Sequence, residues 1–167
     1  SAEKYSGILD GALMGASIPY FFSAKVDLSS LEAIKLIYTA FSIIRGGFRR
    51  EDIMTYAKCG FSGISREECD ELEIYAETWQ INGSRWTDGS VWNMNPGGYT
   101  ARKTDATSEK LLRINDIKTR LITPLTVFDE DIKSAKTVKE SAEALMTFLL
   151  KIRLEHSIKA RVEALKK

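Results

Sequence analysis

The sequence predicts an all-α fold of roughly five to seven helices. Apolar residues recur at helical spacing in nearly every segment of the 167-residue chain. Three segments also open with a Ser/Thr-x-x-Glu pattern, which caps a helix N-terminus through reciprocal hydrogen bonds. These capping boxes are expected at Ser29 and Glu32, at Ser65 and Glu68, and at Thr137 and Glu140. A hydrophobic content of 44% suits one domain with a sizeable core.

The N-terminal segment predicts one helix followed by a short extended piece. Apolar residues recur at helical spacing from about residue 3 to residue 16. Pro19 blocks continuation of this helix, and the aromatic residues after it allow a short strand near residues 18–22. No later segment offers a partner strand. The piece is therefore either an extended segment packed on helices or a strand of a neighbouring domain.

Two helices are expected next. The first begins after Leu28, has apolar residues around much of its surface, and ends at Gly46-Gly47. A short helix then runs from about Arg50 to Lys58 and is closed by Gly60. The wide apolar surface of the first helix predicts a central position in the domain.

The next segment combines a well-marked helix with a long loop. The helix follows Ser65, and its apolar face is formed by Leu72, Tyr75, Ala76 and Trp79. From Gln80 to about Thr104 the helical pattern is lost, and loops of this length are usually functional or disordered. The loop aromatics either stack on nucleic-acid bases or anchor the loop on the core. The stacking candidates are Trp86, Trp92 and Tyr99.

The C-terminal part predicts three more helical segments. The first runs from about Thr107 to Ser134 and contains Pro124, which is expected to kink or split it. The second follows Thr137, and the last begins near Leu154.

Catalytic and metal-binding patterns are absent from the sequence. There is no phosphate-binding Gly-x-x-x-x-Gly-Lys-Ser/Thr loop and no Gly-x-Ser-x-Gly elbow. His156 is the single histidine, and it is expected to be a solvated surface residue. The run 129–131 suggests either a magnesium site or, with lysines beside it, a solvated acidic face. We expect no catalytic residue, no metal and no cofactor in this chain.

The two cysteines and the hydropathy of the sequence indicate where in the cell the protein is expected to lie. Cys59 and Cys69 are too few for a four-cysteine metal site. Reduced thiols are expected, as in the cytoplasm, and a single disulfide between the two is the alternative. No apolar run reaches 18 residues, so no membrane span is expected.

Two basic groups are candidates for nucleic-acid contact. One surrounds the Gly46-Gly47 turn, and the other flanks the aromatic loop. Cations beside aromatic residues suit backbone contact combined with base stacking, although a solvated surface is the alternative. Glu51 and Asp52 offer a further alternative, because they could pair with the arginines at the turn. The DNA-contact candidates are Arg45, Arg49, Arg50, Lys58, Arg85, Arg102 and Lys103.

Several motifs occur in the order found in a known family. They are Ile18-Pro19-Tyr20-Phe21-Phe22, Lys58-Cys59-Gly60-Phe61, Leu72-Glu73-Ile74-Tyr75, Ile81 to Trp86, Ile114 to Lys118, and Thr123-Pro124-Leu125. With these motifs over most of its length, the chain resembles the AddB (RexB) subunit of bacterial AddAB-type helicase–exonucleases. It departs from the family pattern at Ser17, Cys59, Ile74 and Lys118.

This resemblance implies a fragment of a larger subunit that acts in double-strand break repair and recombination. Residues 28–167 would be a helical accessory domain, similar to the 2B-like insertion of a helicase-like subunit, and residues 1–27 would belong to the adjoining core. The fragment itself would not be an enzyme, whereas the parent complex would be an ATP-dependent helicase/exodeoxyribonuclease. It would help to form a DNA path and an interface with an AddA-like helicase–nuclease subunit. The alternative is a purely structural protein–protein interaction domain without DNA contact.

Overall fold

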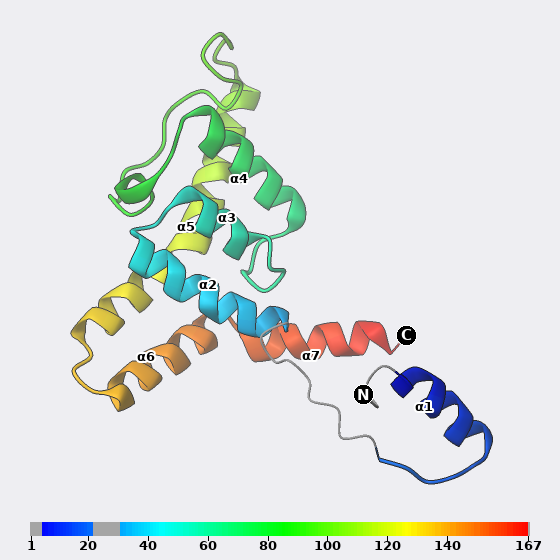
Figure 1. The fold of residues 1–167 in the computed structure, drawn as a ribbon. Coiled ribbons are helices and arrows are strands. Elements are labelled where there is room, and N and C mark those ends of the chain that lie inside the picture. Colours follow the sequence, from blue (N-terminus) through cyan, green and yellow to red (C-terminus); the bar gives the residue numbers. More distant parts are fainter. Residues whose placement is uncertain (1–4, 22–30, 167) are drawn as a thin grey trace.

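The computed structural model describes residues 5–21 and 31–166, and this part of the chain is all-α (Figure 1). The elements are α1 (Ser6–Gly15), α2 (Glu32–Gly46), α3 (Arg50–Ala57), α4 (Arg66–Thr78), the 3-10 helix η3 (Gly83–Trp86), α5 (Asp105–Ser134), α6 (Val138–Lys151) and α7 (Leu154–Leu165). Residues 18–21 form no strand, so the short strand allowed near residues 18–22 is not found in these four residues. A single strand here would have no partner for its backbone hydrogen bonds, which explains its absence from residues 18–21. The all-α prediction is confirmed for the described residues.

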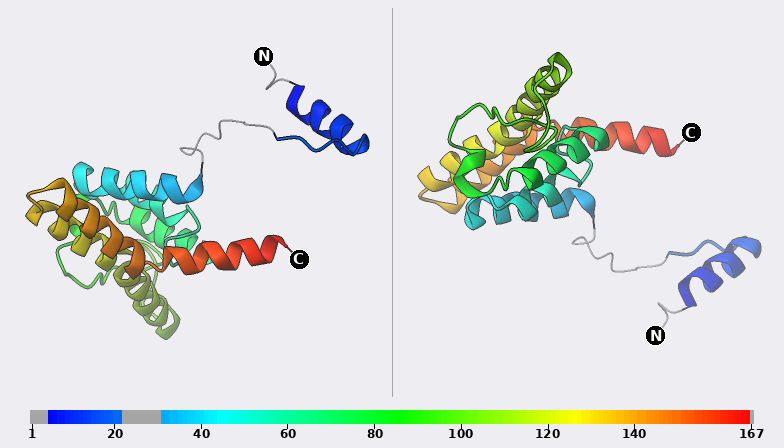
Figure 2. Two further views of the ribbon diagram at one scale, coloured as in Figure 1. Left: turned by 90° about the horizontal axis from the view of Figure 1, so that it is seen from below. Right: turned by 90° about the horizontal axis from the view of Figure 1, so that it is seen from above.

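Helix α1 stands apart from the other helices (Figures 1 and 2). Its apolar residues are largely exposed, with Ile8 and Met14 each at 71%. Among the residues that the structure describes, the hydrophobic core is built from residue 33 onward and takes in no side chain of α1. The proposed domain boundary between residues 27 and 28 falls outside the described ranges and stays a prediction.

Two of the three predicted capping boxes are confirmed. The Ser65 side chain accepts from the Glu68 N–H at 3.2 Å, and the Glu68 carboxylate accepts from the Ser65 N–H at 2.8 Å. Thr137 and Glu140 form the same pair at the start of α6. Helix α5 begins with a third capping box, between Thr104 and Thr107, that the Ser/Thr-x-x-Glu search does not detect.

The capping box predicted at Ser29 and Glu32 is wrong. Helix α2 begins at Glu32, and its N-cap is Leu31, which makes no side-chain cap. Glu32 is thus the first helical residue rather than the third, and its carboxylate pairs with Arg161 of α7 instead. Ser29 itself lies outside the described residues.

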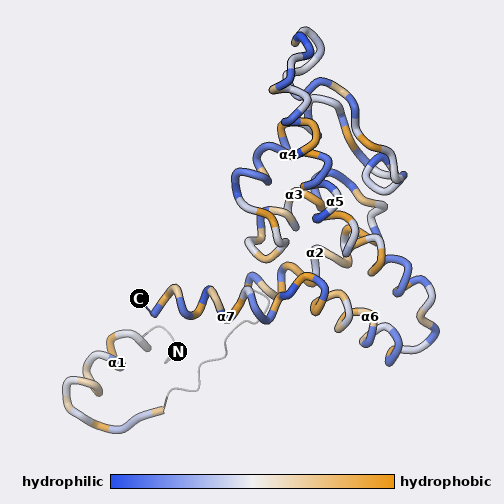
Figure 3. Tube along the Cα trace, turned by 180° about the vertical axis from the view of Figure 1, so that it is seen from behind, coloured by the Kyte–Doolittle hydropathy of each residue, from blue (hydrophilic) through white to orange (hydrophobic). Residues whose placement is uncertain are grey.

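Helix α5 forms the centre of the domain and packs against α2, α4 and α6. Near α6, the Phe128 ring stacks on Phe148 with centroids 4.6 Å apart, and Phe41 of α2 meets the Phe128 ring edge-on. Pro124 lies inside α5 without splitting it, and the helix bends along its length (Figure 1). Helix α7 projects from this body, and hydrophobic and hydrophilic residues alternate along it (Figure 3).

Candidate nucleic-acid interface

The turn between α2 and α3 carries three arginines, Arg45, Arg49 and Arg50, which we call the basic corner. The turn is possible because Gly47 adopts a left-handed conformation with φ of 70°, which a glycine takes at little cost. Phe48 is also left-handed, with φ of 60°, and its buried ring fastens the turn to the core. The three guanidinium groups are consequently displayed around one tight reversal of the chain.

A second turn supports the basic corner. The Arg50 N–H donates to the Asn82 side-chain oxygen at 2.9 Å, and the Gly83 N–H donates to the Phe48 carbonyl at 3.1 Å. These bonds join the start of α3 to the segment that leads into η3. The orientation of the basic corner is therefore fixed by residues more than thirty positions later in the chain.

The three arginines differ in their electrostatic surroundings. Arg49 donates to the Asp52 carboxylate at 3.0 Å, whereas neither Arg45 nor Arg50 has an ion-pair partner among the residues that the structure describes. Glu51 also makes no ion pair within the described ranges. Among the described residues, pairing of an acidic residue with the corner thus applies to Arg49 alone, and the guanidinium groups of Arg45 and Arg50 pair with no carboxylate there.

The surface around the basic corner is hollowed on both sides of Arg49. One hollow of about 450 Å³ extends along α2 and is lined by Tyr38, Phe41, Ser42, Arg45, Gly46 and Arg49. A smaller hollow of about 150 Å³ lies toward the second turn and is lined by Arg49, Arg50, Glu51, Gln80 and Asn82. Both hollows are open to solvent, and arginines of the basic corner line each of them.

Lys58 does not join the basic corner. Its ammonium group lies 2.6 Å from the Glu73 carboxylate, and this hydrogen-bonded contact raises the pKa of Lys58. The charge of Lys58 is already compensated within the fold. This candidate is the least suited of the seven to bind a phosphate.

Trp86 and Trp92 are buried, with 1% and 3% of their surface exposed. The Trp92 ring stacks on Tyr75 at a centroid distance of 5.3 Å and meets Trp86 edge-on. Neither indole can reach a nucleic-acid base as it lies, so the stacking assignment of these two residues is corrected. They anchor the loop on the core, because burying two indole rings removes a large apolar area from water.

Two residues of α5 that sequence reasoning did not select hold the loop in place. Asn115 bonds both the N–H and the carbonyl of Trp92, at 2.8 and 2.9 Å. The Lys118 ammonium donates to the Ser90 carbonyl at 2.7 Å and lies 4.7 Å from the Trp92 ring centroid. Lys118 is buried, and this burial lowers its pKa. The one available signal is the Ile114 to Lys118 segment quoted for the family resemblance, in which Lys118 departs from the family pattern.

The remaining loop candidates divide into one structural residue and an exposed group. The Arg85 guanidinium donates to the Trp79 carbonyl at 3.0 Å, so it fastens the loop. Tyr99 is 78% exposed and leans on Trp79 with ring centroids 4.3 Å apart. Arg102 and Lys103 are exposed and make no ion pair within the described part of the chain. Their DNA contact stays a prediction.

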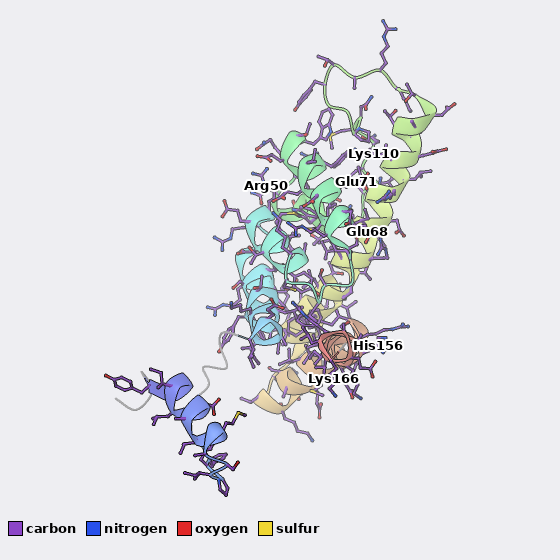
Figure 4. All side chains as sticks on the ribbon, turned by 90° about the vertical axis from the view of Figure 1, so that its right-hand side faces the viewer. Arg50, Glu68, Glu71, Lys110, His156 and Lys166 are labelled. Carbon is purple, nitrogen blue, oxygen red and sulfur yellow. The ribbon has the colours of Figure 1, made fainter. Side chains whose placement is uncertain are left out.

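Several acidic residues of the domain form ion pairs with lysines and arginines. Asp129 pairs with Lys133 at 2.6 Å, and Glu71 of α4 meets Arg113 and Lys110 of α5 at 3.1 and 3.9 Å. Figure 4 shows Glu71 and Lys110. No group of three histidine, cysteine or carboxylate side chains is placed to hold a metal ion within the described ranges.

His156 lies on α7, away from Glu68 and Glu71 of α4 (Figure 4). Its side chain is exposed, as expected for a solvated surface histidine. In the part of the chain that the structure describes, no helix is both long and apolar enough to cross a membrane.

Comparison with known proteins agrees with the motifs. No model of a known protein family matches the chain. It is 29% identical over 164 residues to the B subunit of the ATP-dependent helicase/deoxyribonuclease of Clostridium botulinum strain Langeland, covering 98% of this chain. The corresponding subunits of Acetivibrio thermocellus and Clostridium perfringens strain SM101 are 28% and 31% identical over 96% and 88% of the chain. The chain is AddB-like. It spans only 13–14% of the length of these three relatives.

Within this AddB-like chain, several family-type motifs coincide with structural contacts. The Ile114 to Lys118 motif contains Asn115 and Lys118, which hold the loop on α5, although Lys118 is one of the positions that depart from the family pattern. The Leu72 to Tyr75 motif supplies two buried residues of α4, and Trp86 ends the next motif in the core. The resemblance therefore rests largely on residues that build the fold, while the basic corner lies outside the quoted motifs.

Proposed function

We propose that this AddB-like chain is a non-catalytic helical module of the B subunit of a bacterial ATP-dependent helicase/exonuclease. In that enzyme it contacts DNA through Arg45 and Arg50 of the basic corner. The observation that carries the proposal is that these two arginines have no ion-pair partner within the described residues. Arg49, in contrast, forms an ion pair with Asp52. The proposed setting is double-strand break repair and recombination in the cytoplasm.

The physical basis is recognition of the phosphate backbone. A guanidinium group presents a planar fork of donors that matches two phosphate oxygens, and it remains charged at any physiological pH. Each phosphate that is neutralised releases condensed counterions, which makes binding salt-dependent and independent of sequence. Two free arginines provide few contacts, so the isolated chain is expected to bind DNA weakly.

A second observation supports the subunit-interface part of the proposal. Helix α6 exposes a line of apolar residues spaced by multiples of four, with Val138 at 87%, Met146 at 57% and Leu150 at 66% exposure. The opposite face of α6 is buried through Phe148. An outward apolar line of this kind suits contact with another protein surface, such as an AddA-like subunit or the rest of the parent subunit. It equally favours the alternative function, a protein-interaction domain without DNA contact.

DNA titration over a range of salt concentrations tests the proposal and separates it from this alternative. The variant Arg45→Gln with Arg50→Gln should weaken DNA binding about equally across sequences and flatten the salt slope by about two units. Arg66→Gln with Arg153→Gln is the matched control, because it removes two exposed arginines elsewhere on the domain that also lack ion-pair partners in the described ranges. Unchanged affinity and slope in the basic-corner variant would overturn the proposal in favour of the protein-interaction function.

A further inference from the structure

One face of α2 carries a line of polar and aromatic side chains that leads to the basic corner. Lys35, Tyr38, Ser42 and Arg45 are spaced by three or four residues, which places them on the same side of the helix. All four are exposed. The single acidic residue of α2 is Glu32, and it pairs with Arg161 at the other end of the helix. From residue 33 to residue 46, α2 therefore presents positive charge without compensation from within the helix.

Tyr38 lies in the middle of this line with an accessible ring. Its side chain is 66% exposed, and its hydroxyl makes no hydrogen bond within the described ranges. The next aromatic residue, Phe41, turns inward and meets Phe128 edge-on at 5.2 Å. Both aromatics line the hollow of about 450 Å³ that also contains Arg45 and Arg49. The hollow thus combines an open aromatic face with a guanidinium group that has no ion-pair partner in the described part of the fold.

We infer that this hollow on α2 binds single-stranded DNA, with a base stacked on the Tyr38 ring and a neighbouring phosphate held by Arg45. The inference rests on the proposed function, since it names the form of DNA that the basic corner receives. The two residues are seven positions apart, which is about 10 Å along a helix axis. A short stretch of one strand can therefore reach both groups.

The ring distinguishes single strands from duplex DNA. In a duplex the base faces are stacked on one another, so an aromatic side chain on a helix surface meets only phosphates and groove edges. A single strand exposes base faces, and stacking on an aromatic ring tolerates any sequence. Duplex DNA would use Arg45 and Arg50 and leave Tyr38 without a role.

Fluorescence anisotropy with two probes tests the inference. The probes are a labelled oligothymidylate of about 20 nucleotides and a labelled duplex of the same length. Tyr38→Leu should weaken binding of the oligothymidylate roughly five-fold or more and leave duplex binding unchanged. Tyr38→Phe, which keeps the ring, should retain single-strand binding. Tyr5→Leu is the matched control, because Tyr5 is a similarly exposed tyrosine beside the separate helix α1.

The outcomes separate this inference from the proposed function. If Tyr38→Leu binds oligothymidylate normally while Arg45→Gln with Arg50→Gln loses affinity, the single-strand inference is wrong and the proposed function stands. An equal loss on both probes, or an equal loss with Tyr38→Phe, also overturns it. If the unmodified chain binds neither probe at low salt, the proposed function fails and the inference with it. Thermal unfolding of each variant checks the fold, and no change is expected because Tyr38 lies outside the core.

Discussion

Asn115 of α5 forms hydrogen bonds with both the N–H and the carbonyl of Trp92, 23 residues earlier in the chain. Its amide nitrogen also donates to the Leu111 carbonyl one helical turn back, at 2.9 Å, which fixes the orientation of the side chain. One asparagine thus replaces the pairing that a neighbouring strand would give to the loop backbone. This clamp explains how a long segment of the chain holds a fixed path without secondary structure of its own.

Replacing Asn115 by alanine should therefore destabilise the domain by roughly 2 kcal/mol, because two part-buried backbone groups of Trp92 lose their partners. Denaturant unfolding monitored by tryptophan fluorescence measures this change. Asn93→Ala is the control, since Asn93 is exposed in the same loop and makes no side-chain hydrogen bond within the described part of the chain. Equal stability of the two variants would show that the clamp contributes nothing.

Glu68 should contribute stability that disappears in acid. A hydrogen bond from Arg120, and a further one from the Ser65 N–H, lower the pKa of Glu68 from its ordinary value of 4.5. The unfolded chain therefore binds protons more readily, so this stabilisation is present above about pH 4.5 and is lost as the pH falls through the folded pKa. Since Arg120 is partly exposed, we expect an effect of about 1 kcal/mol.

Glu68→Gln tests this pH dependence. The variant should be less stable than the unmodified chain at pH 7, and the difference should shrink as the pH is lowered below about 4.5. Glu109→Gln is the control, because Glu109 is exposed on α5 without an ion pair among the described residues. A difference between Glu68→Gln and the unmodified chain that is constant over this pH range would contradict the assignment.

Lys118 should give a pH dependence of the same sign as Glu68, but at alkaline pH. Burial lowers its pKa from 10.5, with a smaller opposing effect from Asp88, so the folded state releases this proton more easily than the unfolded state. The stability of the unmodified chain should then rise as the pH increases from the folded pKa toward 10.5. Lys118→Met lacks this gain. As the pH rises toward 10.5, the denaturant midpoint of the unmodified chain should therefore increase relative to the midpoint of Lys118→Met. A parallel response in Lys118→Met and the exposed control Lys151→Met would contradict it.

Local sequence patterns predicted the helices well, because their signals lie within one or two turns. Ser65 and Glu68 form the predicted capping box, and Gly47 ends α2 as expected. Ser29 and Glu32 have the same spacing, yet the helix begins at Glu32, whose carboxylate meets Arg161 from the far end of the chain. The Ser/Thr-x-x-Glu spacing alone therefore does not decide at which residue a helix begins.

The candidate site was harder to predict, because it depends on pairings that sequence spacing does not encode. The same loop contains Trp92, which is buried, and Tyr99, which is exposed, although both suited a stacking role. Their difference follows from Asn115 and Lys118, which lie on a helix that comes later in the chain. Similarly, an arginine is free to bind a phosphate only if no carboxylate pairs with it. Which side chains face an arginine is determined by the folded structure and not by spacing along the sequence.

The two faces of α6 should respond differently to substitution. Phe148 stacks on Phe128 and is 1% exposed, so Phe148→Ala should cost about 3–5 kcal/mol. Met146→Gln, on the exposed face, should change stability by no more than about 0.5 kcal/mol. Chemical denaturation of both variants measures these values. A large loss of stability in Met146→Gln would show that the outward face already serves the fold and is not free for a partner.

The final prediction concerns Arg49 and Arg50, which are adjacent in sequence but differ in their contacts. Arg49→Gln removes the pair with Asp52 and should lower stability by a few tenths to about 1 kcal/mol, because Arg49 is largely exposed. Arg50→Gln should leave stability unchanged, since its contact with Asn82 uses the backbone N–H, which the substitution keeps. In DNA titrations the order should reverse, with Arg50→Gln flattening the salt slope by about one unit and Arg49→Gln by less. Unfolding curves and salt titrations of the same two proteins provide both readouts. If Arg49→Gln instead flattened the slope as much as Arg50→Gln without losing stability, the Asp52 pair would not hold Arg49, and all three arginines of the basic corner would be available to phosphate.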